Sequence, residues 1–512
     1  MQHVMQSADL KKAVVDSLSN PSEDIARSVL SAAGVDPNSI EKSISTATGL
    51  VAYDLQAPAK NLFPAATPIR NRLPRVGGGV GAATNWKTIT GLSGSGFDSI
   101  GWVPEGQRAG QMNYVAADRA ALYRTIGEED SATFEAINAG KSFEDVQATM
   151  SIRLLQKTML KEEMALLGGN NSLALGAPAA PALAAAGTGA SLPAATYSVI
   201  VVALSIEGFK HSSLAGGAAT TKTVTGADGK TFTLNGGSSN RSANATQAVT
   251  SGQTLAATVA PVVGAVGYAW FVGLAGAEKL EAITTINSAV FAAPLAGTGQ
   301  PASAVSADCS TNATAFDGLL TTALKAGSGA YVKSLSAGVA GVGTTLTASG
   351  RGSVNEIDDM LQAMCDASQV SPTVLYVNSQ QLRNITDKCL STGASSLLQY
   401  YQAPADGGYQ MTASGMIDFY YNPFLLDGGV KIPIKIHPNL PPGTILGWCE
   451  DLPLQYQNSE TPNVAEVKVR QDYYQIDWPI TTRQRQKGVY AEETLAVYAP
   501  FAVGVITNIA KG

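Results

Sequence analysis

The chain has 512 residues, of which 45% are hydrophobic and only 14% charged, and its formal net charge is −6. This balance excludes an intrinsically disordered protein, which would be poor in apolar residues and rich in charge. It also excludes a protein that binds nucleic acid through bulk positive charge. Because so few residues are charged, much of the surface is expected to contact protein.

Cysteine and histidine give no sign of a metal site or a disulfide framework. The cysteines contain no CxxC pair, and no histidine has a second ligand type at metal-binding spacing. We therefore predict scattered structural residues in a reducing compartment, with no metal and no cofactor. The residues concerned are Cys309, Cys365, Cys389, Cys449, His3, His211 and His437.

Residues 1–30 lack the apolar core of a signal peptide, so we expect no targeting segment. Two uncharged stretches, 173–206 and 242–277, raise the question of a membrane helix, and the second is long enough to span a bilayer. Pro261 and several glycines interrupt it, and β-branched and aromatic residues lie between them. This pattern favours short buried strands over a membrane span.

The N-terminal part predicts short amphipathic helices in the first fifty residues, followed by an extended arm over Asn61–Gly79, where three prolines forbid a long helix. No acidic residue occurs between Leu55 and Phe97. Such an arm could lie on nucleic acid or on an acidic neighbour, and a solvated linker is an equally open interpretation. Its candidate contact residues are Lys60, Arg70, Arg72 and Arg75.

Residues Asn85–Ala132 alternate between polar and apolar types around a glycine cluster at 91–96, which predicts a long two-stranded ribbon with a loose tip. The ribbon carries Trp86 and Trp102. Because an isolated hairpin is marginally stable in water, these side chains need a partner surface, from this chain or from another.

The clearest helix is predicted between Gly140 and Gly168, with Ser142 and Asp145 as a capping box and Gly168-Gly169 as its end. One face carries an apolar stripe, and the opposite face is expected to be solvated. At about 1.5 Å per residue this helix is roughly 40 Å long. The stripe comprises Phe143, Val146, Met150, Leu154, Met164 and Leu167, and the solvated face Glu144, Arg153, Lys161 and Glu162.

Between 176 and 309 the composition shifts to Ala, Gly, Thr, Ser and Val, with Pro- and Gly-rich joints on both sides. Strands are predicted at 196–205, 222–234 (a hairpin with an Asp-Gly turn), 253–261, 267–274 and 280–286. These regular short strands around Trp270 predict an inserted β-sandwich, with low-complexity disorder as the alternative.

After residue 315 the sequence pattern becomes α/β, with predicted helices and strands in alternation. Ser353 and Glu356 form a capping box for a helix, Pro372 precedes a buried strand, and Asn378 or Ser379 caps the next helix. The remaining segments predict a mixed sheet with helices against it. Strands are expected at 416–421, 430–436 and 465–477, and a single apolar strand at 494–506.

No catalytic motif is present: the sequence has no GxSxG, GxxxxGK[ST], HExxH or HRD. Adjacent acidic pairs such as Glu128-Glu129 are typical of solvated edges, and His437 lies in a turn-like stretch with no evident acidic partner. Gly77, Gly79 and Ala82 match a loose dinucleotide fingerprint, but a proline-rich arm precedes them where a strand is required. We therefore predict that the chain is not an enzyme.

The order of these elements resembles that of tailed-bacteriophage major capsid proteins with the Hong Kong 97-type fold. The resemblance is carried by Trp86–Thr133 as the extended loop, Ser142–Leu167 as the spine helix, and the segments 371–385, 428–453, 467–486 and 494–506. It covers the chain outside the insertion and rests on order and pattern. Similar capsid proteins often carry immunoglobulin-like insertions; others form Lys–Asn cross-links, for which no pair can be assigned here.

The resemblance implies an α+β fold with an inserted immunoglobulin-like β-sandwich. The expected segments are an N-terminal arm (1–80), an extended loop (81–135), a peripheral domain with the spine helix (136–175), the insertion (176–309), an axial domain (310–440) and a return to the peripheral domain (441–512).

The resemblance also implies a function: a major capsid protein that self-assembles, as hexamers and pentamers, into an icosahedral shell around a double-stranded DNA phage genome. Expected partners are scaffold, portal and decoration proteins and packaged DNA bound non-specifically, in a virion made in a bacterial cytoplasm. The alternatives are a phage tail or surface adhesion protein with an immunoglobulin-like module, and an enzyme with an unrecognised site. Candidate subunit-contact residues are Trp86, Trp102, Arg108 and Arg119.

Overall fold

The computed structural model describes residues 64–93, 102–141, 144–350, 352–390, 399–402, 409–412, 416–425, 428–452 and 463–511. The helices predicted in the first fifty residues lie outside these ranges. The chain forms two compact units, Met1–Phe63 with Gly140–Glu144, and Pro64–Ala139 with Asp145–Gly512. Except for Gly140, Lys141 and Glu144, all described residues belong to the second unit.

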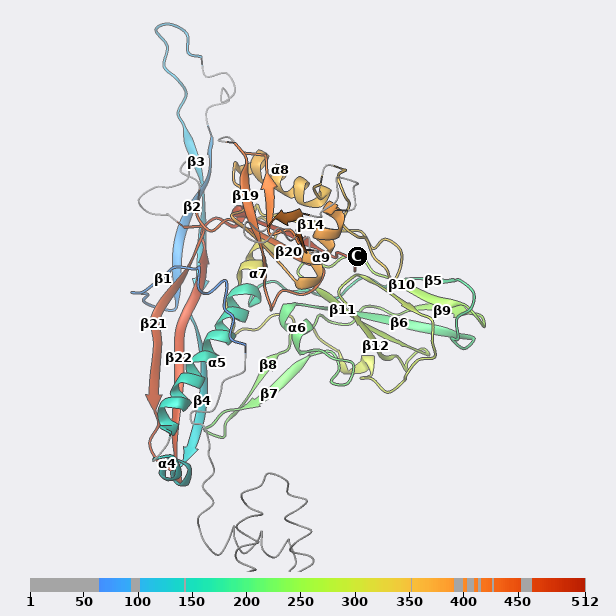
Figure 1. The fold of residues 1–512 in the computed structure, drawn as a ribbon, viewed down its shortest axis with the longest axis horizontal. Helices are drawn as coiled ribbons and strands as arrows, with labels where there is room; N and C mark the ends of the chain where they lie inside the picture. Colours follow the sequence, from blue (N-terminus) through green and yellow to red (C-terminus); the bar gives the residue numbers. More distant parts are fainter. Residues whose placement is uncertain are drawn as a thin grey trace, which may run out of the picture. The chain divides into compact units, whose positions relative to one another are not determined.

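The predicted ribbon is formed by strands β2 (Ala83–Ser93) and β3 (Asn113–Leu122), which pair antiparallel. The segment 102–112 continues beyond the paired part (Figure 1). The ribbon is shorter than expected, because Arg124–Thr133 form a separate strand, β4, that pairs with β22. Alternation along a strand does not reveal its partner, so the sequence could not separate β4 from the ribbon.

The spine helix α5 (Val146–Gly168) packs against a four-stranded sheet, called the long sheet below. Met150 and Leu154 of α5 pack with Ala132 and Val489 of the sheet. Figure 1 shows α5 running along β4 and β22. The sheet order is β1 (Arg75–Val76), β21 (Ala465–Asp477), β22 (Gln484–Val497) and β4, and the short helix α4 (Phe134–Gly140) follows β4.

Helix α5 ends where predicted but begins later. Gly168 is its last residue and Gly169 its C-cap. At the other end the N-cap is Asp145, whose carboxylate accepts the backbone N–H groups of Gln147 and Ala148. The predicted capping box was therefore wrong, and Ser142 itself lies outside the described residues. The 23 residues give a helix of about 35 Å.

A six-stranded sheet forms the centre of the α/β part, and side chains on both of its faces are buried. Along β15, Val374 and Tyr376 belong to one hydrophobic core, and Leu375 and Val377 belong to another. Helices α8 and α9 cover this second core. Its order is β14 (Tyr331–Ser334), β23 (Val503–Thr507), β20 (Ile445–Trp448), β15 (Val374–Val377), β19 (Val430–Ile436) and β18 (Phe419–Asn422). The helices of this region are α7 (Leu319–Leu324), α8 (Asn355–Ser368) and α9 (Ser379–Leu390).

Two local predictions in this region were wrong. The N-cap of α8 is Val354, because the Ser353 hydroxyl bonds Asp358 and the Glu356 carboxylate accepts the N–H of Thr347. The apolar run 494–506 is two strands in different sheets, since Pro500 opens a 3₁₀ turn between β22 and β23. Of the two caps considered for α9, Asn378 is the one whose side chain accepts a helical N–H, that of Gln380.

Between Ala182 and Phe291 two sheets pack face to face, and their shared core surrounds Trp270, whose side chain is fully buried. All strands expected here are present. Strands β5 and β9 were missed because they are rich in Ala, which is depleted in strands, and β13 because it has only four residues. The first sheet is β13 (Ser288–Phe291), β10 (Thr254–Thr258) and β5 (Ala182–Ala186). The second is β12 (Lys279–Thr284), β11 (Gly267–Gly273), β6 (Ala195–Leu204) and β9 (Ala245–Val249).

The inserted segment is also tied into the main core. Helix α6 (Ile206–His211) follows β6, and Ile206 packs so tightly on Gly168 that a Cβ there would lie 2.6 Å from its Cδ1. Deleting 176–309 would therefore remove a main-core residue together with the sandwich. The described elements are completed by the hairpins β7 (Thr221–Thr225)/β8 (Thr231–Asn235) and β16 (Gln399–Gln402)/β17 (Tyr409–Thr412), and by the 3₁₀ turns at Ala302–Ala304 and Pro500–Ala502.

Trp270→Ala is expected to destabilise the sandwich by about 3–5 kcal/mol, the usual range for truncating a buried Trp. The substitution also removes the indole N–H, which donates a hydrogen bond to the Thr284 hydroxyl 2.8 Å away. Urea unfolding of the isolated chain measures the loss. Trp102→Ala is the matched control, because that indole is exposed and its removal should leave subunit stability unchanged; equal losses in both variants would contradict the assignment of Trp270 to the core.

Candidate subunit-contact site

Several large apolar side chains of the ribbon and its tip are exposed to solvent. Trp102, at its tip, is 88% exposed, so its own subunit provides no core for it. Monomeric proteins rarely leave large contiguous apolar patches in water, and such patches commonly mark protein contacts. The exposed apolar residues of the ribbon and tip are Ile89, Trp102, Val103, Met112, Tyr114, Val115 and Leu122.

Trp86, the other predicted contact residue, finds part of its partner surface in its own chain. Its ring meets Tyr498 edge-on, with centroids 5.4 Å apart. A shallow hollow of about 430 Å³ lies beside it, with walls formed by both strands of the ribbon. The hollow is lined by Asn85, Trp86, Lys87, Asp118, Arg119 and Ala120.

Arg108 and Arg119 are exposed, as a contact role requires. Within the described parts of the chain neither guanidinium has an ion pair. Across the ribbon Lys87 and Asp118 form an exposed pair, 3.5 Å apart. The ribbon therefore presents charges of both signs around an apolar surface.

The arm arginines behave differently from the prediction. Arg70 Nε lies 2.8 Å from the Glu162 carboxylate, and Arg72 pairs with Glu450. Arg75 contacts Glu162 and also reaches the carboxylates of β21 and β22 described below. These three arginines thus bind acids of their own chain, whereas the prediction had them face a genome or a neighbour. Lys60 lies outside the described residues.

Two adjacent glutamates of α5 bind the arm. The Glu163 carboxylate accepts the backbone N–H groups of Ile69 and Arg70, at 3.0 and 2.8 Å. It also lies 2.6 Å from Nε2 of His437, and both side chains are fully buried. Because Nδ1 of His437 accepts the Asn439 N–H at 3.1 Å, Nε2 is the nitrogen that donates. His437 therefore has the acidic partner that the sequence did not reveal.

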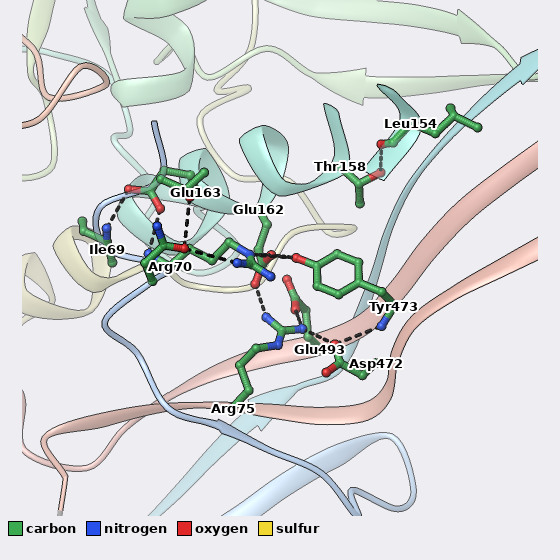
Figure 2. A network of polar contacts seen from close by, with 12 residues as sticks. Ile69, Arg70, Arg75, Leu154, Thr158, Glu162, Glu163, Asp472, Tyr473 and Glu493 are labelled. Atoms are coloured by element: carbon green, nitrogen blue, oxygen red, sulfur yellow. Dashed lines mark hydrogen bonds and ion pairs between the residues drawn. The ribbon is translucent and has the colours of Figure 1, made fainter. Parts of the chain in front are cut away.

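Glu162 was expected on the solvated face of α5, but it is only 1% exposed. Figure 2 shows it between the arm and the long sheet, facing Arg70, Arg75 and Tyr473. A sequence signal existed: steps of four residues from Met150 and Leu154 lead through Thr158 to Glu162, and all four are buried.

Acidic side chains from three elements meet at Arg75: Glu162 of α5, Asp472 of β21 at 2.6 Å and Glu493 of β22 at 2.9 Å (Figure 2). Burial, and next the charge of Glu162, raise the pKa of Glu493 to about 8. Burial lowers the pKa of Arg75, but the Asp472 hydrogen bond and the surrounding carboxylates outweigh it and raise that pKa overall. The cluster therefore joins the arm, the spine helix and the sheet.

Neither a metal site nor a membrane helix is found in the described part of the chain. No group of three or more His, Cys, Asp or Glu side chains in it could hold a metal ion. Among its helices, none combines the length and the apolarity needed to cross a bilayer.

Comparison with known proteins gives matches at the level of structure only: no protein-family model matches, and no curated protein is similar in sequence. The capsid of a native GTA particle is 8% identical with a TM-score of 0.40, covering 91% of this chain and 99% of that chain. The capsid of Myoviridae phage XM1 is 7% identical with a TM-score of 0.39, covering 90% and 98%. A structure from Mycobacterium phage Bobi is 11% identical with a TM-score of 0.37, covering 90% and 97%.

These TM-scores are below 0.5, so the function has to be argued from the chain's own geometry. The predicted α+β class and the order of ribbon, spine helix, inserted sheets and central mixed sheet are confirmed by the elements themselves. Over about nine-tenths of its length, the chain is similar to the capsid structures of a phage and of a GTA particle.

Proposed function

We propose that the chain is the major capsid protein of a tailed phage, a structural subunit that assembles into an icosahedral shell. The observation that carries this proposal is the β2–β3 ribbon with its exposed Trp102, a surface that one subunit cannot bury by itself. Closed shells repeat one contact around each symmetry axis, so a modest gain per contact becomes a large gain per particle.

The buried polar groups fit a structural role better than a catalytic one. Glu162, Glu163 and Arg75 are occupied by contacts that join the arm, α5 and the long sheet. A tail or surface adhesion protein, the alternative function, would leave the ribbon and α5 without a role. We therefore propose a non-enzymatic protein whose activity is assembly.

The proposed partners are further copies of the chain in hexamers and pentamers, a scaffold, a portal, decoration proteins and packaged double-stranded DNA. The arm arginines are not part of the proposed DNA contact, because acids of the same chain bind them. The predicted segment boundaries and the immunoglobulin-like nature of the insertion are kept as proposals, with α6 assigned to the main core. The proposed location is the virion, after synthesis in a bacterial cytoplasm.

Electron microscopy of the full chain, expressed with its neighbouring genes, tests the proposal. Closed particles of uniform diameter are expected. A stable monomer at high concentration, with no particles even beside a co-expressed scaffold, would sink the proposed function.

Trp102→Ala is expected to lower the disassembly temperature of the particles while the melting of unassembled subunits stays unchanged. Burying an aromatic side chain of this size contributes about 2–3 kcal/mol per subunit. Differential scanning calorimetry of particles and of subunits separates the two effects. Trp102→Phe is the control and should retain most of the particle stability; particles unaffected by the alanine variant would remove Trp102 from the contact.

A further inference from the structure

Two buried glutamates meet between the spine helix and the long sheet. Glu162 of α5 is 1% exposed and Glu493 of β22 is 0% exposed, and both contact the Arg75 guanidinium (Figure 2). The other oxygen of Glu493, Oε1, is buried and has no hydrogen-bond donor among the described residues. A buried carboxylate oxygen without a donor is costly, whereas a protonated carboxyl group can itself donate to the neighbouring glutamate.

The charges in contact around this pair do not balance when every acid is ionised. Arg70 and Arg75 supply two positive charges. Glu162, Glu493 and Asp472 supply three negative charges. One proton on the pair restores the balance, and an excess charge inside a buried cluster is unfavourable.

The neighbouring elements add no further positive charge in contact with the pair. Arg124 of β4 lies directly across from Glu493, but its Nε donates to the Ala315 carbonyl at 3.2 Å. The Tyr473 hydroxyl of β21 donates to Glu162, which adds a hydrogen bond and no charge. The pair therefore depends on the two arm arginines and on its own proton.

We propose that Glu162 and Glu493 share one proton at neutral pH and act as a switch that holds α5 against β22 of the long sheet. In the closed state Glu493 donates to Glu162, and Arg75 bridges both carboxyl groups. When the proton leaves, two ionised carboxylates face each other and push α5 and β22 apart. Burial, and next the charge of Glu162, raise the pKa of Glu493 to about 8, so the switch operates just above neutral pH.

The arm reports the state of this switch because it is bound on both sides of it. On the helix side, the Glu163 carboxylate accepts the N–H groups of Ile69 and Arg70. On the sheet side, β1 pairs with β21, and the Gly79 N–H donates to the Val469 carbonyl at 3.1 Å. When α5 and the sheet separate, the arm cannot keep both sets of contacts.

The loss of a single proton sets the size of the effect. The closed state binds this proton with a pKa of about 8, whereas a glutamate released into water has a pKa of about 4.3. Protons therefore favour the closed state, and opening increases as the pH rises. Between pH 7 and pH 9 the open population should increase about tenfold.

Hydrogen exchange of the isolated full-length chain measures this opening. After division by the exchange rate of an unstructured peptide at the same pH, amides of residues 69–79 should exchange about tenfold faster at pH 9 than at pH 7. Glu162→Gln and Glu493→Gln should each abolish this rise, because either variant leaves a single carboxylate of the pair beside Arg75. Glu492→Gln changes a partly exposed acid on the same strand and should retain the rise.

Infrared spectroscopy gives a second readout that does not require the joint to open. Wild type should show the carbonyl stretch of a protonated carboxylic acid at pH 7, which disappears by pH 9, and Glu493→Gln should lack it. A wild type without this band, or without faster exchange at pH 9, overturns the switch. A rise that persists in both glutamine variants also overturns it and assigns the titration to another group, such as His437. These measurements use the isolated chain, so their failure leaves the proposed function standing, and a chain that never assembles leaves the switch standing.

Discussion

Glu163→Ala is expected to destabilise the unassembled subunit by about 3–6 kcal/mol. The carboxylate accepts hydrogen bonds from the backbone of Ile69 and Arg70 and from His437 Nε2 in a fully buried position. Removing it leaves the buried N–H groups of Ile69 and His437, and the half-buried N–H of Arg70, without an acceptor. Each buried unsatisfied donor costs about 1–3 kcal/mol, and the half-buried one costs less because water can reach it. Urea denaturation at neutral pH measures the change in the free energy of unfolding.

Two controls make this result specific. Glu163→Gln keeps one carbonyl acceptor and should lose about half as much stability. Glu128→Ala removes a glutamate whose surface pair with Lys161, 2.6 Å away, is worth less than about 1 kcal/mol. If Glu163→Ala is no more destabilising than Glu128→Ala, Glu163 does not hold the arm.

Glu493→Gln is expected to make the subunit more stable than wild type at alkaline pH. In the folded chain the pKa of Glu493 is raised to about 8 by burial and by Glu162, whereas an unfolded glutamate titrates near its ordinary value of about 4.3. The fold therefore favours the protonated form of Glu493. Its contribution to stability is fully present below pH 4.3 and is lost as the pH rises through 8. The loss for wild type is about 4–5 kcal/mol, and the glutamine, an uncharged isostere, avoids it.

Urea unfolding of subunits between pH 5 and 9 tests this directly. The wild-type free energy of unfolding should fall more steeply with pH than that of the variant, and the curves should converge at low pH. Glu492→Gln is the matched control. Glu492 lies on the same strand but is partly exposed, and it pairs with Arg470. A Glu493→Gln variant that is less stable than wild type at pH 8.5 would show that Arg75 needs the charged carboxylate.

The sequence predicted those elements whose pattern is complete within one segment. Strand β21 was expected over 465–477 and is found at Ala465–Asp477. Its alternating pattern and the turn residues on both sides determine the strand and its bounds. The end of α5 at Gly168-Gly169 and the burial of Trp270 were predictable for the same reason. The ribbon and its exposed Trp102 were also predictable, since a hairpin cannot cover its own tryptophans.

What the sequence could not reveal are partners that lie far apart along the chain. Glu163 and His437 are 274 residues apart, and each alone looks like a solvated residue. The arm arginines had no acidic neighbour in sequence, so their partners Glu162 and Glu493 became visible only once α5 and β22 were packed together. Strand β4 was joined to the wrong partner because the period of a strand is the same in a ribbon and in a sheet.

The placement of β4 also dictates when this protein can complete its fold during synthesis. Its partner β22 begins at Gln484, about 350 residues after β4 ends at Thr133, and at 5–20 residues per second a ribosome needs roughly 20–70 s to make that stretch. The seven sandwich strands, all between Ala182 and Phe291, are available much earlier. A nascent chain therefore carries a finished sandwich but an unpaired β4 and an uncovered α5. Chains that end before Gln484 lack β22, so β4 is expected to stay unpaired in them.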